Sequence, residues 1–261
     1  MRKVTIQYQP FKRLKFSRYH TGNFPSDWND TTPKQLIAIA CLMKQSISDV
    51  QFLSIMTGLS KRIIKKLDDY QRFQLIELFD TFHSDKPYNE FIIDKLFCGD
   101  IVLFKPETKL KNVTFGQFIF IDTYFTEYQN TSSLEDLNKF IAAAYLPFGQ
   151  TFTDKSIITN YKKTAKLDLI TKEAIVINYH LIRDWLCEVY PLVFQKSTEN
   201  LMENQNPNKK EKPKNNTNNG WLNILENIIG DDIINQDKYS NLSLHSTLRF
   251  LTNKIKANLK K

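Results

Sequence analysis

The feature that most constrains this chain is an abrupt change in composition between residues 195 and 220. Upstream, apolar side chains recur with helical spacing, as they do again downstream. The segment between, QKSTENLMENQNPNKKEKPKNNTNNG, holds almost no apolar side chain and many Asn, Lys and Pro. Such a segment cannot bury enough surface to offset the entropy of ordering it. We therefore predict a helical body over residues 1–195, a disordered linker over 196–219 and a small, tethered helical module over 220–261.

Capping residues and apolar periodicity predict that the body is multi-helical and that the protein is mainly α. Thr32, Pro33 and Gln35 form a capping box with proline in the first turn, which predicts a helix start. Further Ser or Thr residues precede the apolar-periodic segments that follow, at positions 46, 60, 114, 132 and 171. In the C-terminal module, helices are expected to begin near residues 220 and 242.

A small β element is expected near the N-terminus. Alternating or β-branched runs predict short strands near residues 4–8, 90–93 and 101–104. The last two are separated by Cys98-Gly99-Asp100 and are expected to form a hairpin that pairs with the first. Residues 11–31, which contain turn-forming residues, are expected to wrap around the body as an irregular arm.

Charge and cysteine content narrow the class of protein. The net charge of +8 and pI near 9.2 invite a nucleic-acid interpretation, but a bias toward Lys and Asn is also what an AT-rich genome produces. Cys41, Cys98 and Cys187 each stand beside apolar residues and are expected to be buried, reduced thiols in a cytoplasmic protein. No apolar run approaches the roughly 18 residues needed to span a bilayer, which predicts no membrane association.

Catalytic and metal-binding patterns are not found in the sequence. The four histidines are far apart and none has the spacing of a metal-binding pair. The carboxylate pairs Asp68-Asp69 and Asp231-Asp232 are adjacent residues, which point about 100° apart on a helix and do not converge on one ion. We therefore predict no catalytic residue, no metal site and no cofactor, and a protein that is not an enzyme.

One segment admits a nucleic-acid interpretation. Residues 46–67 predict two helices joined at a glycine, which matches a helix-turn-helix in length. In that interpretation Ser60, Lys61, Arg62 and Lys65 lie on the exposed face of the second helix and contact DNA. The same pattern also describes an ordinary helical hairpin with its apolar side packed inward and its lysines in solvent.

Aromatic residues gather in the second half of the body. They occur in consecutive predicted helices at Tyr124, Phe125, Tyr128, Phe140, Tyr145, Phe148 and Phe152. Most are expected to form core, but an exposed aromatic face would anchor a protein partner.

Three stretches resemble the tail assembly chaperones of tailed phages. The first covers residues 31–82, where TTPKQLIAIACLMK is followed by a turn containing Thr-Gly-Leu-Ser. The second runs from residue 110 to 152 and includes Thr-Phe-Gly at 114–116 and FIAAAYLPFGQTF at its end. The third is the tethered module from residue 221 onward, which is similar to the extension of longer chaperones of this group. The N-terminal arm and β element depart from the pattern.

The resemblance implies a non-enzymatic morphogenesis protein that binds tail tube or tape-measure subunits in the host cytoplasm. A tether would raise the effective concentration of a second contact with the partner. The expected contact or packing residues of the module are Trp221, Leu222, Ile224, Leu225, Ile228, Leu248 and Leu251. Deleting residues 196–261 is expected to weaken partner binding and leave the body folded. The alternatives are a structural virion component, such as a head–tail connector or internal protein, and the DNA-binding protein described above.

Overall fold

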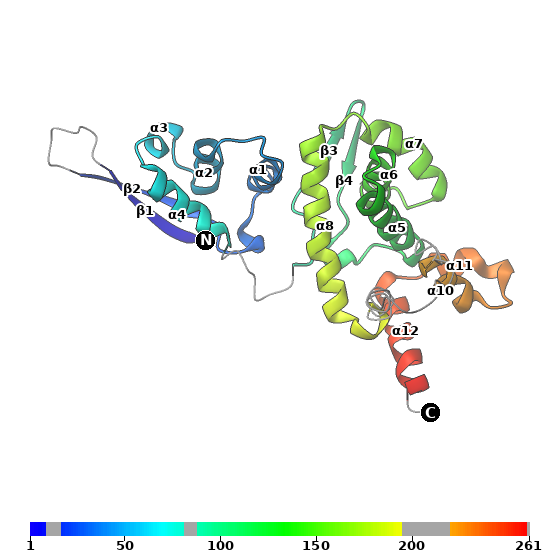
Figure 1. Ribbon diagram of the computed structural model, residues 1–261. Helices are drawn as coiled ribbons and strands as arrows, with labels where there is room; N and C mark the ends of the chain where they lie inside the picture. Colours follow the sequence, from blue (N-terminus) through cyan, green and yellow to red (C-terminus); the bar gives the residue numbers. More distant parts are fainter. Residues whose placement is uncertain (9–16, 81–87, 195–219, 260–261) are drawn as a thin grey trace, which may run out of the picture. The chain divides into compact units, whose positions relative to one another are not determined.

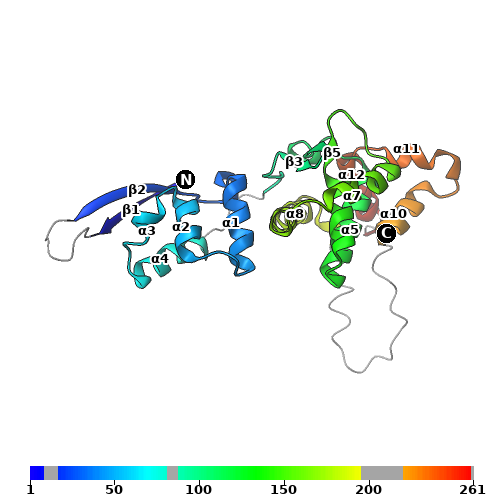
Figure 2. The ribbon, with the colours of Figure 1, turned by 90° about the horizontal axis from the view of Figure 1, so that it is seen from above.

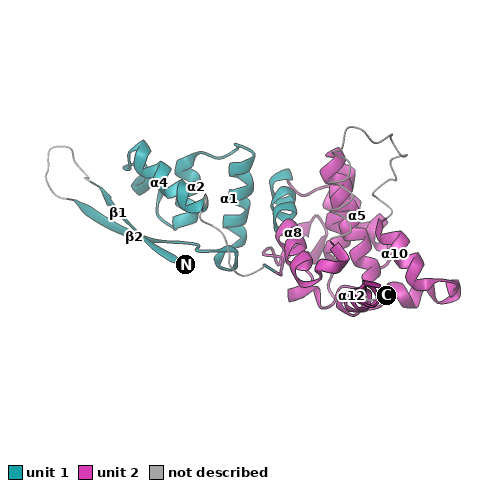
Figure 3. Cartoon of the chain, turned by 60° about the horizontal axis from the view of Figure 1, so that its bottom comes forward, with its two compact units in different colours: residues 1–88, 169–178 teal, residues 89–168, 179–261 magenta. Residues whose placement is uncertain are grey.

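The computed structural model is mainly helical, as the sequence predicts, with a two-stranded sheet near the N-terminus (Figure 1). The residues that it describes are 1–8, 17–80, 88–194 and 220–259. The described chain divides into two compact units, shown in different colours in Figure 3. Unit 1 comprises residues 1–88 and 169–178, and unit 2 comprises residues 89–168 and 179–261.

This division differs from the predicted one at the C-terminal module. The predicted boundary falls at residue 195, whereas residues 179–194 and 220–259 belong to the same compact unit. The physical reason is that the module packs against a helix of the predicted body, as described below. The predicted linker, 196–219, lies outside the described residues.

Unit 1 is a β-hairpin packed against short helices. Its elements are β1 (Arg2–Tyr8), β2 (Arg18–Phe24), η1 (Trp28–Asp30), α1 (Pro33–Met43), α2 (Asp49–Thr57), α3 (Lys61–Ile64) and α4 (Asp69–Asp80). The strand predicted at residues 4–8 is confirmed, but its partner is β2 and not the predicted hairpin downstream. The segment 11–31, which was expected to be irregular, therefore contains strand β2. Its hydrogen bonds to β1, and not its own composition, make it a strand.

The core of unit 1 lies between the hairpin and the helices. Ile6 and Phe24 of the hairpin pack with buried residues of α1 to α4, among them Ala38, Ile39, Phe52, Leu53, Met56, Leu59, Ile64, Leu67 and Leu75. Gly22 of β2 makes the closest approach: a Cβ atom there would lie 2.5 Å from the Thr57 carbonyl oxygen. Only glycine allows the strand to pass so near the end of α2.

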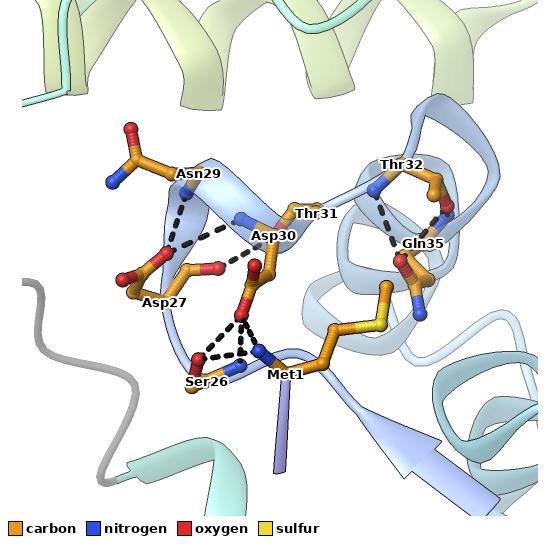
Figure 4. A network of polar contacts seen from close by, with 8 residues as sticks. All are labelled: Met1, Ser26, Asp27, Asn29, Asp30, Thr31, Thr32 and Gln35. Atoms are coloured by element: carbon orange, nitrogen blue, oxygen red, sulfur yellow. Dashed lines mark hydrogen bonds and ion pairs between the residues drawn. The ribbon is translucent and has the colours of Figure 1, made fainter.

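Polar contacts fix the segment between the hairpin and α1 (Figure 4). The Met1 amino group contacts the Asp30 carboxylate, which also accepts a hydrogen bond from the Ser26 amide at 3.2 Å. The amino group and Ser26 lower the pKa of Asp30 from 3.8 to about 2. The predicted capping box is present, because Thr32 accepts from the Gln35 amide at 3.3 Å and the Gln35 side chain accepts from the Thr32 amide at 2.9 Å.

Unit 2 is built around the helix formed by Phe115–Thr131. Its elements are β3 (Lys95–Cys98), β4 (Ile101–Phe104), η2 (Thr108–Leu110), α5 (Phe115–Thr131), α6 (Leu134–Ala144), β5 (Leu146–Pro147), α7 (Asp154–Thr164), α10 (Gly220–Ile229), η5 (Ile233–Asn235), α11 (Gln236–Ser240) and α12 (Leu244–Leu259). Helix α8 (Leu169–Val189) contributes to both units. Helix α5 contacts α6 (Figure 1) and, from the C-terminal part of the chain, α10, α11 and α12 (Figure 2).

A three-stranded antiparallel sheet with the order β3-β4-β5 completes unit 2. The strand predicted at residues 101–104 is confirmed as β4, but the prediction at residues 90–93 is wrong. Phe91 and Ile93 are buried in an irregular segment, and side chains satisfy their carbonyl groups. The Lys105 ammonium donates to the Phe91 carbonyl at 2.8 Å, and the Tyr145 hydroxyl donates to the Ile93 carbonyl at 2.9 Å.

Candidate functional site

The C-terminal module is held on α5 by Trp221. Its indole ring lies edge-on to three phenylalanine rings, with centroids 5.0 Å from Phe118, 5.4 Å from Phe194 and 6.2 Å from Phe115. Edge-to-face pairs of this kind add to the free energy of apolar burial. Phe115 and Phe118 are fully buried. The first turn of α10 is therefore part of the core of unit 2.

A buried carboxylate completes the contact. Asp122, 2% exposed, accepts from the Trp221 indole nitrogen at 2.7 Å, from Arg183 Nε at 2.8 Å and from the Tyr179 hydroxyl at 3.2 Å. Burial, with a smaller effect of Asp122, raises the pKa of Tyr179 well above 10, so that the phenol keeps the proton it donates. Burial has the largest single effect on the pKa of Arg183 and lowers it, but the charge and hydrogen bond of Asp122, with smaller effects of Tyr179 and Cys187, together raise the pKa overall. Three donors thus satisfy a charge that burial would otherwise disfavour.

The start of α12 adds a backbone contact. The Phe115 amide donates to the Leu242 carbonyl at 2.8 Å, and the Leu244 amide donates to the Val113 carbonyl at 3.1 Å. These bonds flank an isolated antiparallel bridge between Thr114 and Ser243. The chain just before α5 is therefore joined to the chain just before α12 by strand-like pairing.

His245 fixes the same corner through its side chain. One ring nitrogen lies 2.8 Å from the Tyr190 hydroxyl and the other 2.5 Å from the Lys109 carbonyl oxygen. The Trp185 ring packs at 5.8 Å from the imidazole. Both nitrogens and the ring face are engaged within unit 2, so this histidine has a packing role in the described structure.

The seven predicted module residues fall into three groups by exposure. Leu225 and Leu248 are buried, at 6% and 0% exposed. Leu222 is exposed, at 42%. The remaining residues are half-buried: Trp221, Ile224, Ile228 and Leu251. Trp221, Leu225 and Leu248 are thus packing residues of unit 2, and binding of a partner by the seven stays a prediction.

The outer face of the sheet in unit 2 presents phenylalanine rings to solvent. Leu96 and Leu103 are paired across β3 and β4 and are buried, so the alternate pairs, Lys95 with Phe104 and Phe97 with Val102, lie on the opposite face. Because Phe104 also pairs with Leu146 of β5, that residue joins the same face. We call this surface the aromatic sheet face; it consists of Phe97, Val102, Phe104, Leu146 and Phe148.

Two residues of the aromatic sheet face are among the most exposed large apolar side chains of the chain. Phe97 is 74% exposed and Phe148 is 85% exposed. The Phe148 ring lies 5.5 Å from Phe104, and the Lys95 ammonium lies 5.3 Å from the centre of the Phe104 ring. A contiguous exposed apolar patch is a common mark of a binding surface.

The module carries exposed apolar residues as well. Ile233 and Ile234 of η5 are 71% and 97% exposed, and Phe250 of α12 is 53% exposed. Helix α12 contacts α5 directly, whereas η5 contacts α11, which in turn contacts α5.

The segment predicted as a helix-turn-helix folds differently in its second half. Helix α2 ends at Gly58, which has a left-handed φ of 72°, but α3 has only four residues. One turn is too short to lay a recognition helix along the major groove. Ser60, Lys61, Arg62 and Lys65 are exposed as predicted. They form a charged surface rather than a base-reading helix.

The described residues bear on metal binding and on membrane insertion. No group of three or more His, Cys, Asp or Glu side chains there is placed to hold a metal ion. None of the described helices is both long and apolar enough to cross a membrane. The three cysteines are free thiols; Cys98 is buried as predicted, but Cys41 and Cys187 are only half-buried because each lies at the edge of its helix's packed side.

No protein-family model, curated protein or solved structure matches this chain.

Sequence reasoning missed Asp122 and Phe97. The signal for the first was a lone carboxylate inside the apolar run FIFIDTYF, since a charge at a core position needs buried donors. The signal for Phe97 was the sequence Lys-Leu-Phe-Cys at residues 95–98. Side chains alternate between the two faces of a strand, so a strand with Leu96 and Cys98 buried places Phe97 on the exposed face.

Proposed function

We propose that this chain is a non-enzymatic assembly chaperone that binds apolar surfaces of tail structural subunits, of the tail tube or tape-measure type. The aromatic sheet face supports this proposal most directly. Subunits that await assembly expose apolar area that is later buried, and a chaperone needs apolar area of its own to cover it. Exposed phenylalanine on a rigid sheet offers such area at little entropic cost.

The exposed apolar residues of η5 and α12 supply a second surface for the same kind of partner. Because the module packs in unit 2, its deletion is expected to uncover Phe115 and Phe118 and destabilise the rest of the unit. A truncation that removes residues 196–261 is therefore a poor test of binding. Substitutions of exposed side chains are the better test.

The test compares the full chain with the double variant Phe97→Ser and Phe148→Ser. Full burial of one phenylalanine is worth about 1.5–3 kcal/mol, and about 1.4 kcal/mol corresponds to a tenfold change in Kd. We expect the double variant to bind a purified tail tube subunit at least about tenfold more weakly and to suppress its aggregation less, as measured by light scattering.

The matched control is Tyr70→Ser with Phe73→Ser, which removes two rings of α4 that are 68% and 57% exposed. It should leave the affinity for the tail subunit nearly unchanged. Equal loss in both double variants, or no binding by the unaltered chain, would contradict the proposal. Recovery of the chain from purified particles at a fixed copy number would instead make it a virion component.

A further inference from the structure

Positive charge is concentrated in the part of the sequence that forms most of unit 1. Residues 1–88 contain fourteen Lys and Arg and eight Asp and Glu, so they carry +6 of the net charge of +8. A composition bias spread evenly along the chain would not produce this asymmetry. The charge therefore calls for a local explanation.

The cations of and beside α3 are exposed and have no carboxylate partner within the described part of the chain: Lys61, Arg62, Lys65 and Lys66. The nearest acidic residues along the chain are engaged elsewhere. Asp68 accepts from the Gln71 amide at 2.7 Å, and Asp69 pairs with Arg72. Four like charges therefore stand together without an ion-pair partner, although the Asp68 carboxylate keeps its charge two residues beyond Lys66.

The hairpin adds a fifth cation from another element. Arg18 of β2 lies opposite Tyr8 of β1. Two residues further along β2, His20 lies opposite Ile6, which is buried. Alternate pairs share a face of the ribbon, so Arg18 lies on the face that packs on the helices. It is exposed because it lies beyond the buried part of that face.

A polar groove of about 680 Å³ runs between β1 and the chain from Lys66 to α4. Five consecutive residues of β1, from Val4 to Tyr8, line it, so the groove follows the edge of the strand and not one face. Its polar lining consists of one carboxylate, Asp68, and of possible hydrogen-bond donors: Thr5, Gln7, Tyr8, Ser17, Lys66, Gln71 and Gln74. Side chains of these types commonly donate hydrogen bonds to phosphate oxygens.

The geometry points to a nucleic-acid-binding surface on unit 1 that contacts the phosphate backbone without reading base sequence. We call it the basic surface; it consists of Arg18, Lys61, Arg62, Lys65 and Lys66. Unpaired Lys and Arg bind phosphates by releasing condensed counterions, which needs no long recognition helix. An acidic protein partner is disfavoured, because the centres of protein interfaces are depleted in lysine. This inference does not depend on the proposed function.

The test measures binding of the full chain by fluorescence anisotropy. The probes are a labelled 20-nucleotide single strand, the matching duplex and a labelled polyglutamate peptide, each at several salt concentrations. The variant combines Lys61→Gln, Arg62→Gln, Lys65→Gln and Lys66→Gln. The control removes four exposed lysines of unit 2 by Lys111→Gln, Lys155→Gln, Lys162→Gln and Lys254→Gln.

We expect sequence-independent binding whose log K falls linearly with log salt. The α3 variant should bind at least about tenfold more weakly at 0.1 M salt. Its salt slope should fall by up to about 0.9 per lost phosphate contact on a duplex and about 0.7 on a single strand. The control should change affinity less than about threefold. Preference for one probe then identifies duplex or single-stranded nucleic acid as the ligand.

Three results would overturn the inference: no binding to either nucleic acid, equal weakening in the variant and its control, or equally tight binding of polyglutamate. Thermal unfolding checks that the α3 variant is folded. If it is not, the single charge reversals Lys61→Glu and Lys65→Glu replace it and should each weaken binding, while Lys155→Glu should not.

Discussion

Unit 1 and unit 2 both bury apolar cores, and side-chain caps begin helices in both, yet they differ in what they leave exposed. On unit 1, the cations of the basic surface have no ion-pair partner within the described residues. In unit 2, lysines more often pair with carboxylates, as Lys105 does with Glu90 and Lys163 with Asp100 at 3.2 Å. Both units expose some aromatic side chains, but only in unit 2 do they gather on one face of a sheet, the aromatic sheet face.

The difference teaches that one chain can carry two surfaces suited to different partners. Unpaired like charges repel one another and are stabilised by a polyanion. Exposed phenylalanines contact water unfavourably and are stabilised by apolar surface. Three further substitutions break or sharpen this comparison by testing what holds each unit together.

The largest expected effect is that of Asp122→Ala in unit 2. The substitution leaves Arg183 without its partner and removes the acceptor for Trp221, which is expected to cost about 3–5 kcal/mol in the free energy of unfolding. Urea unfolding followed by tryptophan fluorescence measures the loss, and hydrogen exchange should show it in α5 and α10 rather than in α2.

Its control is Glu135→Ala, which breaks an ion pair with Lys139 on the surface of α6, where Glu135 is 63% exposed. That pair should contribute less than about 1 kcal/mol. A similar loss of stability in both variants would mean that Asp122 does not anchor the module.

An intermediate effect is expected for Gly22→Ala in unit 1. The new methyl group meets the Thr57 carbonyl oxygen, which is backbone and cannot rotate away, so the hairpin must shift from α2 at a cost of about 1–3 kcal/mol. Hydrogen exchange should show lost protection in β1 and β2. At Gly220 a Cβ atom meets nothing within 4 Å, so Gly220→Ala should be neutral or slightly stabilising.

The smallest effect concerns Asp30 and pH. Its pKa is depressed from 3.8 to about 2, so its ionised form stabilises the folded state above pH about 4. That contribution is lost as the pH falls through the folded value. Thermal unfolding between pH 5 and 2 should therefore show a shallower pH dependence for Asp30→Asn than for the unaltered chain, and identical slopes would rule out this role.

Local chemistry predicted many helix starts because caps act within one turn. Thr32 and Thr114 each accept a hydrogen bond from the amide three residues further along the chain, as predicted. Where starts were predicted at positions 46 and 132, the capping residues are Ser48 and Ser133. Ser60 makes no side-chain capping bond. Strand β2 was not predictable in this way. Its sequence, RYHTGNF, has no apolar alternation, and only its pairing with β1 and the space that Gly22 leaves make it a strand.

The site was less predictable than the fold. The apolar stripe of residues 220–229 would look the same whether it packed on α5 or on another protein, because burial depends on a surface 100 residues away. The prediction of a strand at residues 90–93 was wrong for a related reason. A buried apolar run predicts a strand by default, but Lys105 and Tyr145 supply the hydrogen bonds that a neighbouring strand would have made.

The bridge between Thr114 and Ser243 joins positions that are far apart along the chain, which has a consequence for synthesis on the ribosome. Nascent chains fold as they emerge from the N-terminal end, at about 5–20 residues per second. Until α10 and α12 have left the ribosome, Phe118 of α5 lacks the Trp221 ring that packs against it, and only earlier parts of the chain, such as Phe194, can cover it. Every newly translated copy therefore passes through an interval in which it is itself prone to aggregate.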